Sequence, residues 1–533
     1  MPDERLSPAS AAGAGARARF RRLRRHGAWI CVALAYLTVF PYYARVNNPN
    51  ENVRIWMTRA IVEFHELNLN RASATWGYVN DKAVVSGRLY SSKAPGTSLL
   101  GVPIYAAQRA VARLFGAQPS PRAITLGLRF FGVGVPLAIF LFFFARWAER
   151  VTGSSAARDL LVVALGLGSI LYPYGVIFVG HALAAALAFS SFMLLSLEAP
   201  GAARRGRLAW AGALAGAAVI FEYQAGIAAV VVAAYALARH RRAALWFALG
   251  ALPAVAAFGL YHAVVFGRPW ELPFGHLENP QWAELHKQVG RPDPRAVGGV
   301  LFSIDMGLFI FSPYLLLGVL GALVALAREE RLAGAVILAV SGGLVCFLAT
   351  LPNWHAGWCV GPRYISAVAP FMTAGLAYAW RAARRPFVLS ALAAGLVVPS
   401  VALNVVSGAV YPHYPEVFDN PVFDLTLPLI RDGYVPYSLG WLLGLRRAWS
   451  LLPLALLSLA ALALALRGED ARPRRRLAHG ALALVVAAAF LVPLSRYGRK
   501  PSPAESAAAA FVRATWEPPP TPAAARTAKS PAR

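Results

Sequence analysis

A polar stretch of the chain opens with NNPNENVR (residues 47–54) and closes with YSSKAPG (residues 90–96). Long apolar runs surround it, and the 533-residue chain is 58% hydrophobic and only 14% charged. Soluble globular proteins are typically about 25% charged. Many of the apolar runs approach the roughly 20 residues that a helix needs to cross a bilayer. The sequence therefore predicts an all-α polytopic membrane protein that holds this stretch at one face of the membrane.

The apolar runs predict about 13 transmembrane helices. The first has its apolar core at 29–43, directly after a basic N-terminal segment. A signal peptide is the alternative, but no small-x-small cleavage site follows, so we expect a retained helix. The other expected spans are 123–145, 159–177, 180–197, 208–221, 223–238, 243–266, 300–327, 332–351, 364–380, 387–410, 449–466 and 477–495.

The formal net charge of +27 comes from arginines that lie in short clusters between the apolar runs. This is the positive-inside pattern of membrane proteins, so we expect no nucleic-acid partner. With residue 1 inside and alternating spans, Lys and Arg are much denser in the inside segments. The N-terminus is then cytoplasmic, and the active face is extracytoplasmic. The long outer loops are 47–122, 267–299, 352–363 and 411–447.

Three regions follow from this layout. They are a cytoplasmic basic N-terminus (1–26), a transmembrane domain (27–497) and an extracytoplasmic tail (498–533). The tail is rich in Pro and Ala and is expected to be disordered. The three cysteines show no metal-type spacing with histidine, and no Walker A or H-E-x-x-H pattern occurs.

The first outer loop begins with a helix-start signal. Asn48 can act as the N-cap, Pro49 occupies the first turn, and Glu51 can complete a capping box. An amphipathic helix along the membrane surface is expected to follow. Glu51 therefore has two interpretations. It caps its own helix, or it is a carboxylate at the mouth of the first span that faces a lipid-borne substrate.

Two β-like runs, 75–79 and 84–90, flank a turn at 80–82 and predict a small hairpin. The hairpin would bring Lys93 back toward the membrane, before Pro95 opens a second surface helix at roughly 96–115. A lysine at this position either anchors the chain at the interface by snorkelling or binds a phosphate.

Charged residues elsewhere mark further candidates. Glu222 interrupts an apolar run, where a carboxylate is costly and is a candidate functional residue. Alternatively, it reaches the outer interface and pairs with Arg129 or His181. His276 and Glu278 could act as acid and base, could bind a metal, or could belong to a solvated loop. The involvement of a divalent metal is left open.

The outer loop PNWHAGWCVGPR (residues 352–363) contains Trp354, His355, Trp358 and Arg363. One interpretation is an interfacial aromatic belt. The other is a site in which Arg363 and His355 bind a phosphate while the indoles stack on a sugar or lipid. Arginine suits phosphate because its planar fork donates two hydrogen bonds together.

The layout as a whole resembles the GT-C superfamily of membrane glycosyltransferases, in particular the protein O-mannosyltransferases and the lipid A aminoarabinose transferases. Their first outer loop has an acidic residue soon after the first span and a Lys-Pro-Pro-like element later. Glu51 and KAPG (residues 93–96) match these features, and GPRY (residues 361–364) is similar to an element of bacterial members. The chain departs from the pattern at Ala94, and Glu51 has no adjacent second carboxylate. The likeness of layout covers most of residues 20–500.

This resemblance implies that a sugar is transferred with inversion from a polyprenyl-phosphate-linked donor. The acceptor would be a glycan, lipid or protein, and the location the bacterial inner membrane with its lipids. Glu51 would be the general base. The donor phosphate would be bound by Lys93, Arg363, His355 and Arg88. The sugar or acceptor pocket is expected to draw on Arg54, Tyr90, His181, Glu222, His276, Glu278, Trp354 and Trp358.

The alternative function is a flippase or exporter of a lipid-linked sugar without transfer chemistry. Such a carrier needs polar residues through the depth of the bilayer. The charges inside the expected spans are few, and they lie toward the outer side. This favours the enzyme.

Overall fold

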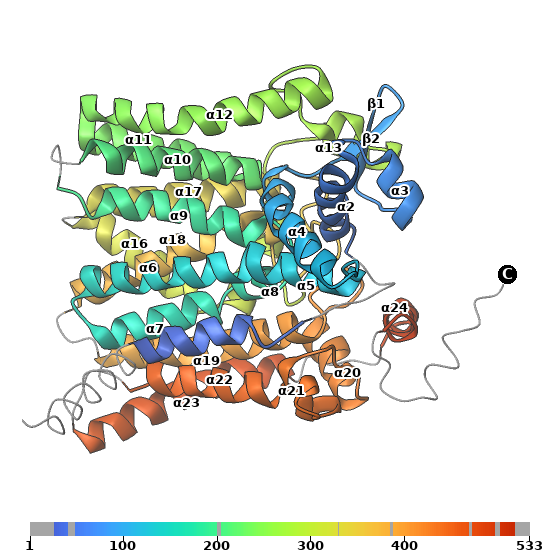
Figure 1. Cartoon of the computed structure of the whole chain (residues 1–533). Coiled ribbons are helices and arrows are strands. Elements are labelled where there is room, and N and C mark those ends of the chain that lie inside the picture. The colour runs from blue at the N-terminus through green and yellow to red at the C-terminus, as the bar shows by residue number, and fades with distance from the viewer. Residues whose placement is uncertain are drawn as a thin grey trace, which may run out of the picture.

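The computed structural model describes residues 26–40, 48–199, 204–328, 330–383, 387–467, 472–495 and 501–516. Almost all of the predicted basic N-terminal segment and the end of the predicted tail lie outside these residues. The described chain is mostly helical, as predicted, and its long helices run side by side from one end of the molecule to the other (Figure 1).

Six segments of the described chain are long and apolar enough to cross a membrane: Pro121–Thr152, Ala225–Phe266, Arg331–Ala349, Phe387–Val410, Arg447–Ala465 and Pro473–Ser495. Shorter apolar helices are His26–Tyr36, His181–Ser196 and Leu315–Ala327. These findings agree with a multi-pass membrane protein. The number of about 13 spans stays a prediction.

The helices of the bundle follow the predicted apolar runs. After His26–Tyr36, they are α5 (Pro121–Arg129), α6 (Val135–Thr152), α7 (Ser155–Gly166), α8 (Leu171–Gly175), α9 (His181–Ser196), α10 (Arg205–Phe221), α11 (Ala225–His240), α12 (Leu245–Phe266), α14 (Pro294–Phe302), α15 (Leu308–Phe311), α16 (Leu315–Ala327), α17 (Arg331–Ala349), α18 (Val368–Ala382), α19 (Phe387–Val410), α22 (Leu452–Ala465) and α23 (Pro473–Ser495). A π-helical turn, Phe130–Gly134, joins α5 to α6.

The other α-helices and the two strands lie in the connections between these helices. They are α2 (Pro49–Phe64), α3 (Asn70–Trp76), β1 (Lys82–Val85), β2 (Arg88–Ser91), α4 (Gly96–Leu114), α13 (Pro280–Lys287), α20 (Leu427–Arg431), α21 (Leu439–Leu442) and α24 (Pro503–Ala514).

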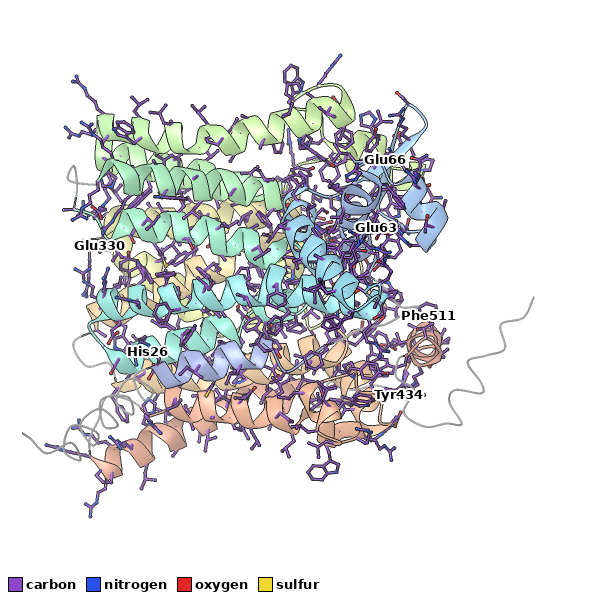
Figure 2. The ribbon with its side chains drawn as sticks, viewed as in Figure 1. His26, Glu63, Glu66, Glu330, Tyr434 and Phe511 are labelled. Carbon is purple, nitrogen blue, oxygen red and sulfur yellow. The ribbon has the colours of Figure 1, made fainter. Side chains whose placement is uncertain are left out.

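The two ends of the bundle differ in character. The short connections rich in arginine gather at one end, on the left of Figure 1, which we call the short-loop end. The elements α2, α3, α4, α13 and α24 and the hairpin gather at the other, which we call the long-loop end. Figure 2 shows His26 and Glu330 at the first and Glu63 and Phe511 at the second. The assignment of the short-loop end to the cytoplasm stays a prediction.

The elements of the first loop pack into a small core of their own. Val53, Met57 and Ala60 of α2 are buried against Tyr261 and Val265 at the end of α12. This apolar contact fixes the first loop to the bundle. α2 is therefore not simply a helix that floats on a membrane surface, since its polar face is buried as well.

The predicted hairpin exists, but its first strand and its turn lie elsewhere. β1 and β2 pair antiparallel, with Lys82 opposite Ser91 and Val85 opposite Arg88. The connecting residues Ser86 and Gly87 both have positive φ, of 49° and 74°, as in a two-residue hairpin turn. Residues 75 and 76 end α3 instead of starting a strand. The predicted strand at 75–79 is wrong. The run 84–90, predicted as one strand, contains the turn at Gly87, so the two strands lie on either side of that turn.

The predicted disordered tail also needs correction. Residues 503–514 form α24, which begins with a complete capping box between Ser502 and Glu505. The helix is held to the long-loop end by an ion pair of 3.0 Å between Arg513 Nη2 and Asp432 Oδ2. Phe511 lies edge-on to Trp358, with ring centroids 6.1 Å apart. Composition indicated disorder, but a cap and tertiary contacts are enough to hold this helix.

Candidate functional site

A cavity of about 510 Å³ opens at the long-loop end, where four loops distant in sequence meet. We call it the loop-end cavity. The first loop contributes Lys93 and Asp81, and the other loops contribute further polar and aromatic side chains. These include Glu278, Trp358, Arg363, Tyr364, His413 and Glu416. The cavity therefore joins the first loop to the 352–363 loop.

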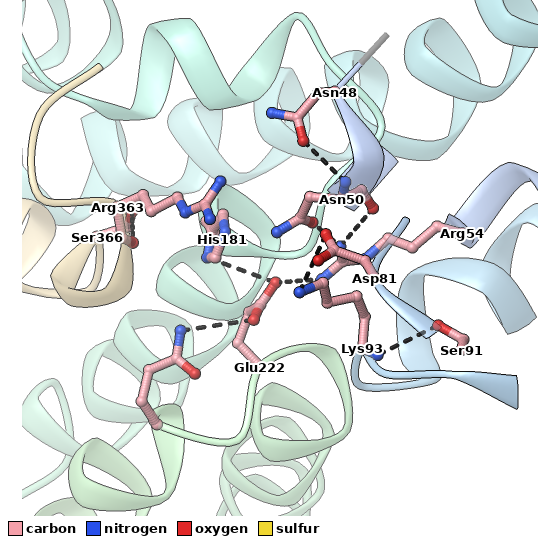
Figure 3. Close-up of polar contacts among 11 residues, drawn as sticks. Asn48, Asn50, Arg54, Asp81, Ser91, Lys93, His181, Glu222, Arg363 and Ser366 are labelled. Carbon is pink, nitrogen blue, oxygen red and sulfur yellow. Dashed lines mark hydrogen bonds and ion pairs between the residues drawn. The ribbon is translucent and has the colours of Figure 1, made fainter. Parts of the chain in front are cut away.

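Lys93 reaches the cavity from the base of the hairpin. Its Nζ lies 3.2 Å from Oδ2 of Asp81. Figure 3 draws the two side chains together. The Ser92 amide and hydroxyl both donate to the carbonyl oxygen of Asp81, at 3.0 Å and 2.6 Å. Asp81 itself has a positive φ of 64°, which aspartate tolerates better than most residues. The hairpin thus places a cation and a carboxylate side by side at the cavity wall.

Arg363 reaches the same cavity from a short 3₁₀ turn, Arg363–Ile365, at the start of α18. The turn is fixed by the Ser366 hydroxyl, which donates to the Arg363 carbonyl at 2.6 Å. The guanidinium is buried, and among the described residues its Nε has no hydrogen-bond partner and no carboxylate forms an ion pair with it. A buried cation without an ion-pair partner is costly, so this group is suited to an anionic ligand.

Gly357 lies beside Arg363. Its φ is +75°, and a Cβ built there would lie 3.9 Å from both Arg363 Nη2 and Glu416 Oε1. A carboxylate therefore faces the guanidinium across this glycine without forming an ion pair with it.

A charged cluster lies close to Lys93 and Arg363 (Figure 3). Glu222 Oε1 lies 2.7 Å from Arg54 Nη2 and 3.4 Å from His181 Nδ1. Burial raises the pKa of Glu222, against the opposing effect of Arg54, Lys93 and Arg363. The predicted pairing of Glu222 with His181 is therefore found, whereas Arg129 is not its partner. Glu222, Arg54 and His181 do not line the cavity itself.

Glu51 is held elsewhere. Its Oε1 accepts from Arg129 Nε at 2.6 Å and from the amide of Phe178 at 2.6 Å, and its Oε2 accepts from Arg129 Nη2 at 2.5 Å. Burial raises the pKa of Glu51, but the charge and hydrogen bonds of Arg129 and the Phe178 amide outweigh this, so the pKa ends below its ordinary value. Glu51 does not line the cavity.

The predicted capping box at Glu51 is absent, because its carboxylate is engaged with Arg129. The N-cap is Asn48 alone, whose Oδ1 accepts from the Asn50 amide at 2.8 Å. That bond orients Asn48 Nδ2 toward His413 Nδ1, 3.0 Å away. A neutral His413 then carries its proton on Nε2. Burial lowers the pKa of His413 to about 3, so the ring is neutral at ordinary pH.

Of the residues predicted for donor and acceptor binding, the cavity brings together Lys93, Arg363, Glu278 and Trp358. Glu278 is partly neutralised by Lys82, with an Nζ to Oε2 distance of 3.1 Å.

The other predicted residues lie away from the cavity lining. His355 stacks on Trp354, with centroids 3.5 Å apart. His276 Nε2 lies 3.3 Å from Glu271 Oε1. Tyr90 packs toward Phe266 in the small core of the first loop, and Arg88 is exposed on the hairpin.

The sequence did not single out Asp81, His413 and Glu416. Asp81 was interpreted only as part of a turn. The predicted hairpin was the available signal. A hairpin brings the residues at its two ends together, and Asp81 and Lys93 lie at the two ends of this one. No local signal marks His413, whose partner Asn48 is 365 residues away.

Within the described residues, no group of three or more His, Cys, Asp or Glu side chains is arranged to hold a metal ion.

No family model and no curated protein matches the chain. Solved structures with similarity include ArnT, a lipid A aminoarabinose transferase of the GT-C superfamily, from Cupriavidus metallidurans bound to undecaprenyl phosphate. The identity is 13% and the TM-score 0.45, over 89% of this chain and 77% of that one. The apo form of the same protein gives 15% identity and a TM-score of 0.45, over 90% and 78%.

A second similar structure is the oligosaccharyltransferase AglB from Archaeoglobus fulgidus, in complex with an inhibitory peptide and a dolichol-phosphate. The identity is 14% and the TM-score 0.44, over 78% of this chain and 58% of that one. AglB, like ArnT, belongs to the GT-C superfamily, the group that the sequence resembles in its layout.

Proposed function

We propose that this chain is a glycosyltransferase that moves a sugar from a polyprenyl-phosphate-linked donor to an acceptor at the extracytoplasmic face of the membrane. The observation that carries the proposal is the convergence of Lys93 and Arg363 on one cavity at the long-loop end, with Arg363 unpaired among the described residues. Two cations at a membrane-protein cavity suit a lipid-borne phosphate. The resemblance in layout to the GT-C superfamily supports the same function.

In this proposal the donor phosphate lies between Lys93 and Arg363. As the bond between the sugar and the phosphate oxygen breaks, negative charge develops on the phosphate, and the two cations stabilise it. Lys93 is paired with Asp81. A phosphate that takes over Lys93 would release the Asp81 carboxylate.

We assign the role of general base to Asp81. Its carboxylate would accept the proton of the acceptor hydroxyl as the hydroxyl oxygen attacks the anomeric carbon, from the side opposite the leaving phosphate. Glu51 is a poorer candidate for this step. A catalytic Glu51 would have to give up two charge-assisted hydrogen bonds to Arg129 and one from the Phe178 amide. We assign Glu51 the role of a positioning residue for α2.

The test uses the full chain in proteoliposomes. Lys93→Ala and Arg363→Ala should each weaken the binding of undecaprenyl phosphate by about tenfold or more, as expected for a lost charge-assisted contact. Native mass spectrometry measures this binding. Asp81→Asn should not weaken this binding, since the carboxylate competes with the phosphate for Lys93.

Activity is followed as the release of undecaprenyl phosphate from polyprenyl-phospho-sugars in a native lipid extract. Asp81→Asn should reduce release by a factor on the order of 10² or more, the usual size of a general-base contribution. Glu63→Gln, in the same loop but outside the cavity, is the control. If Asp81→Asn kept full activity and a well-folded Glu51→Gln lost it, the general base would be Glu51 and not Asp81. No release by the unaltered chain would favour an exporter over a transferase.

A further inference from the structure

An apolar groove of about 760 Å³ lies between α6, α9 and α10. Its walls include Ile139 and Phe143 of α6, Leu187 of α9 and Leu214 of α10. At the long-loop end, the groove is lined by the apolar side chain of Phe221. This groove is separate from the loop-end cavity and shares no lining residue with it.

The opposite end of the groove is strongly basic. Arg146 and Arg150 of α6 line it, together with Arg207 near the start of α10. Arg146 and Arg150 are four residues apart, so they lie on one face of the helix. Both are exposed, and neither forms an ion pair with a described residue, whereas Arg207 is paired with Glu198. Two positive charges at this end therefore have no fixed counter-charge among the described residues.

The same two arginines border a second hollow. This space of about 500 Å³ is lined by His26, Arg146, Glu149 and Arg150. Glu149 Oε1 lies 3.2 Å from Arg158 Nη1, which offsets its negative charge. Arg146 and Arg150 thus stand between a polar hollow and an apolar groove, an arrangement that matches a molecule with a charged head and apolar chains.

We infer that this groove binds a membrane phospholipid with an anionic headgroup, of the phosphatidylglycerol type. The phosphodiester would lie against Arg146 and Arg150, because guanidinium groups donate paired hydrogen bonds to phosphate oxygens. The acyl chains would follow Phe143 and Leu187 along the groove. Surrounding lipid is as apolar as the groove, so the chains add shape complementarity and not a hydrophobic driving force. The headgroup charge should therefore determine which lipid binds.

The long-loop end of the groove offers no contact to the phosphate of a donor lipid. A polyprenyl-phosphate donor whose head lies at Lys93 would place its polar group at the long-loop end. There the groove is lined by Leu100, Leu183 and Phe221, all of them apolar. The arginine end is the place where the groove offers contacts to a phosphate.

The experiment is a lipid titration of the full chain in detergent, followed by native mass spectrometry. Phosphatidylglycerol should bind at least about tenfold more tightly than phosphatidylcholine, since each basic residue near a lipid surface favours anionic lipid. The double variant Arg146→Gln/Arg150→Gln should lose this preference. The matched control, Arg241→Gln/Arg242→Gln, removes two exposed arginines from the α11–α12 turn at the same end and should keep it.

A second variant tests the groove itself. Ala217 lies on the wall formed by α10, and Ala217→Phe would place a larger side chain in the groove without changing charge. This variant should abolish tight binding of phosphatidylglycerol. It should retain the thermal unfolding transition. If both double arginine variants lost the preference for phosphatidylglycerol equally, the lipid would be attracted nonspecifically to the basic surface. This result would overturn the inference. Full binding in Ala217→Phe, or stoichiometric displacement of phosphatidylglycerol by undecaprenyl phosphate, would also overturn it.

Discussion

The ion pair of Glu51 and Arg129 joins the first loop to the bundle and is deeply buried, with side chains only 4% and 7% exposed. Glu51→Gln leaves Arg129 buried without a counter-charge, and breaking such a pair typically costs about 3–5 kcal/mol. We expect a large fall in the thermal unfolding temperature. Glu66→Gln is the control, because its pair with Arg71 is largely exposed and should contribute at most about 1 kcal/mol.

The pH dependence of this pair has a defined sign. The pKa of Glu51 is lowered in the folded protein, so its contribution to stability is present above the ordinary glutamate pKa of about 4.3 and is lost as pH falls below it. Between pH 5 and 8 the difference in stability between Glu51→Gln and the unaltered chain should be constant. A difference that shrinks within that range would contradict the assigned pairing.

Burial of His413 predicts a second pH dependence of stability, at higher pH than that of Glu51. The pKa of His413 is about 3 in the folded protein, compared with about 6.5 in an unfolded chain. Between these values the unfolded state binds more protons, so stability falls as pH decreases from about 6.5 toward 3. His413→Gln should flatten this slope in unfolding temperature measured from pH 7 to pH 4. His65→Asn, at an exposed position, should leave the slope unchanged.

At the scale of elements, α10 and α12 approach each other through glycine. A Cβ on Gly212 would collide with the carbonyl oxygen of Phe247, and a Cβ on Gly250 with that of Ala209. Small residues allow this backbone contact between membrane helices. Gly212→Ala should therefore destabilise the protein by about 1–3 kcal/mol, the usual cost of overpacking. The cost appears as a lower unfolding temperature in detergent.

The matched control is Gly226→Ala near the start of α11, where a Cβ would meet nothing within 4 Å. Alanine is a better helix former than glycine by up to about 1 kcal/mol, so the unfolding temperature should stay the same or rise. Equal losses in the two variants would show that glycine is not needed for close packing at Gly212.

At the scale of the whole molecule, the segregation of short and long loops predicts one orientation in the membrane. We replace Cys31, Cys346 and Cys359 with alanine and introduce a single cysteine at an exposed position. Arg88→Cys on the hairpin should react with a membrane-impermeant maleimide in intact cells. Arg242→Cys at the short-loop end should react only after permeabilisation. The reverse pattern would place the loop-end cavity in the cytoplasm and exclude the proposed extracytoplasmic reaction.

The sequence by itself determined the helical bundle and the beginnings of two loop helices. Apolar runs of span length and the signals at Asn48 and Pro95 are local, so they act wherever the chain folds. The helices α2 and α4 accordingly begin at Pro49 and Gly96. The sequence also pointed to Lys93 and Arg363, because Lys93 lies in the KAPG element and Arg363 ends a short loop with two tryptophans and a histidine.

Only the tertiary structure decided which charged groups meet. Glu51 had a plausible local partner in its own helix, yet it binds Arg129, 78 residues away. Asp81 became a candidate base only because a two-residue turn at Gly87 folds the hairpin so that it lies beside Lys93. The choice of partner depends on which helices become neighbours. That arrangement is set by the packing of many apolar side chains at once, and no short stretch of sequence encodes it.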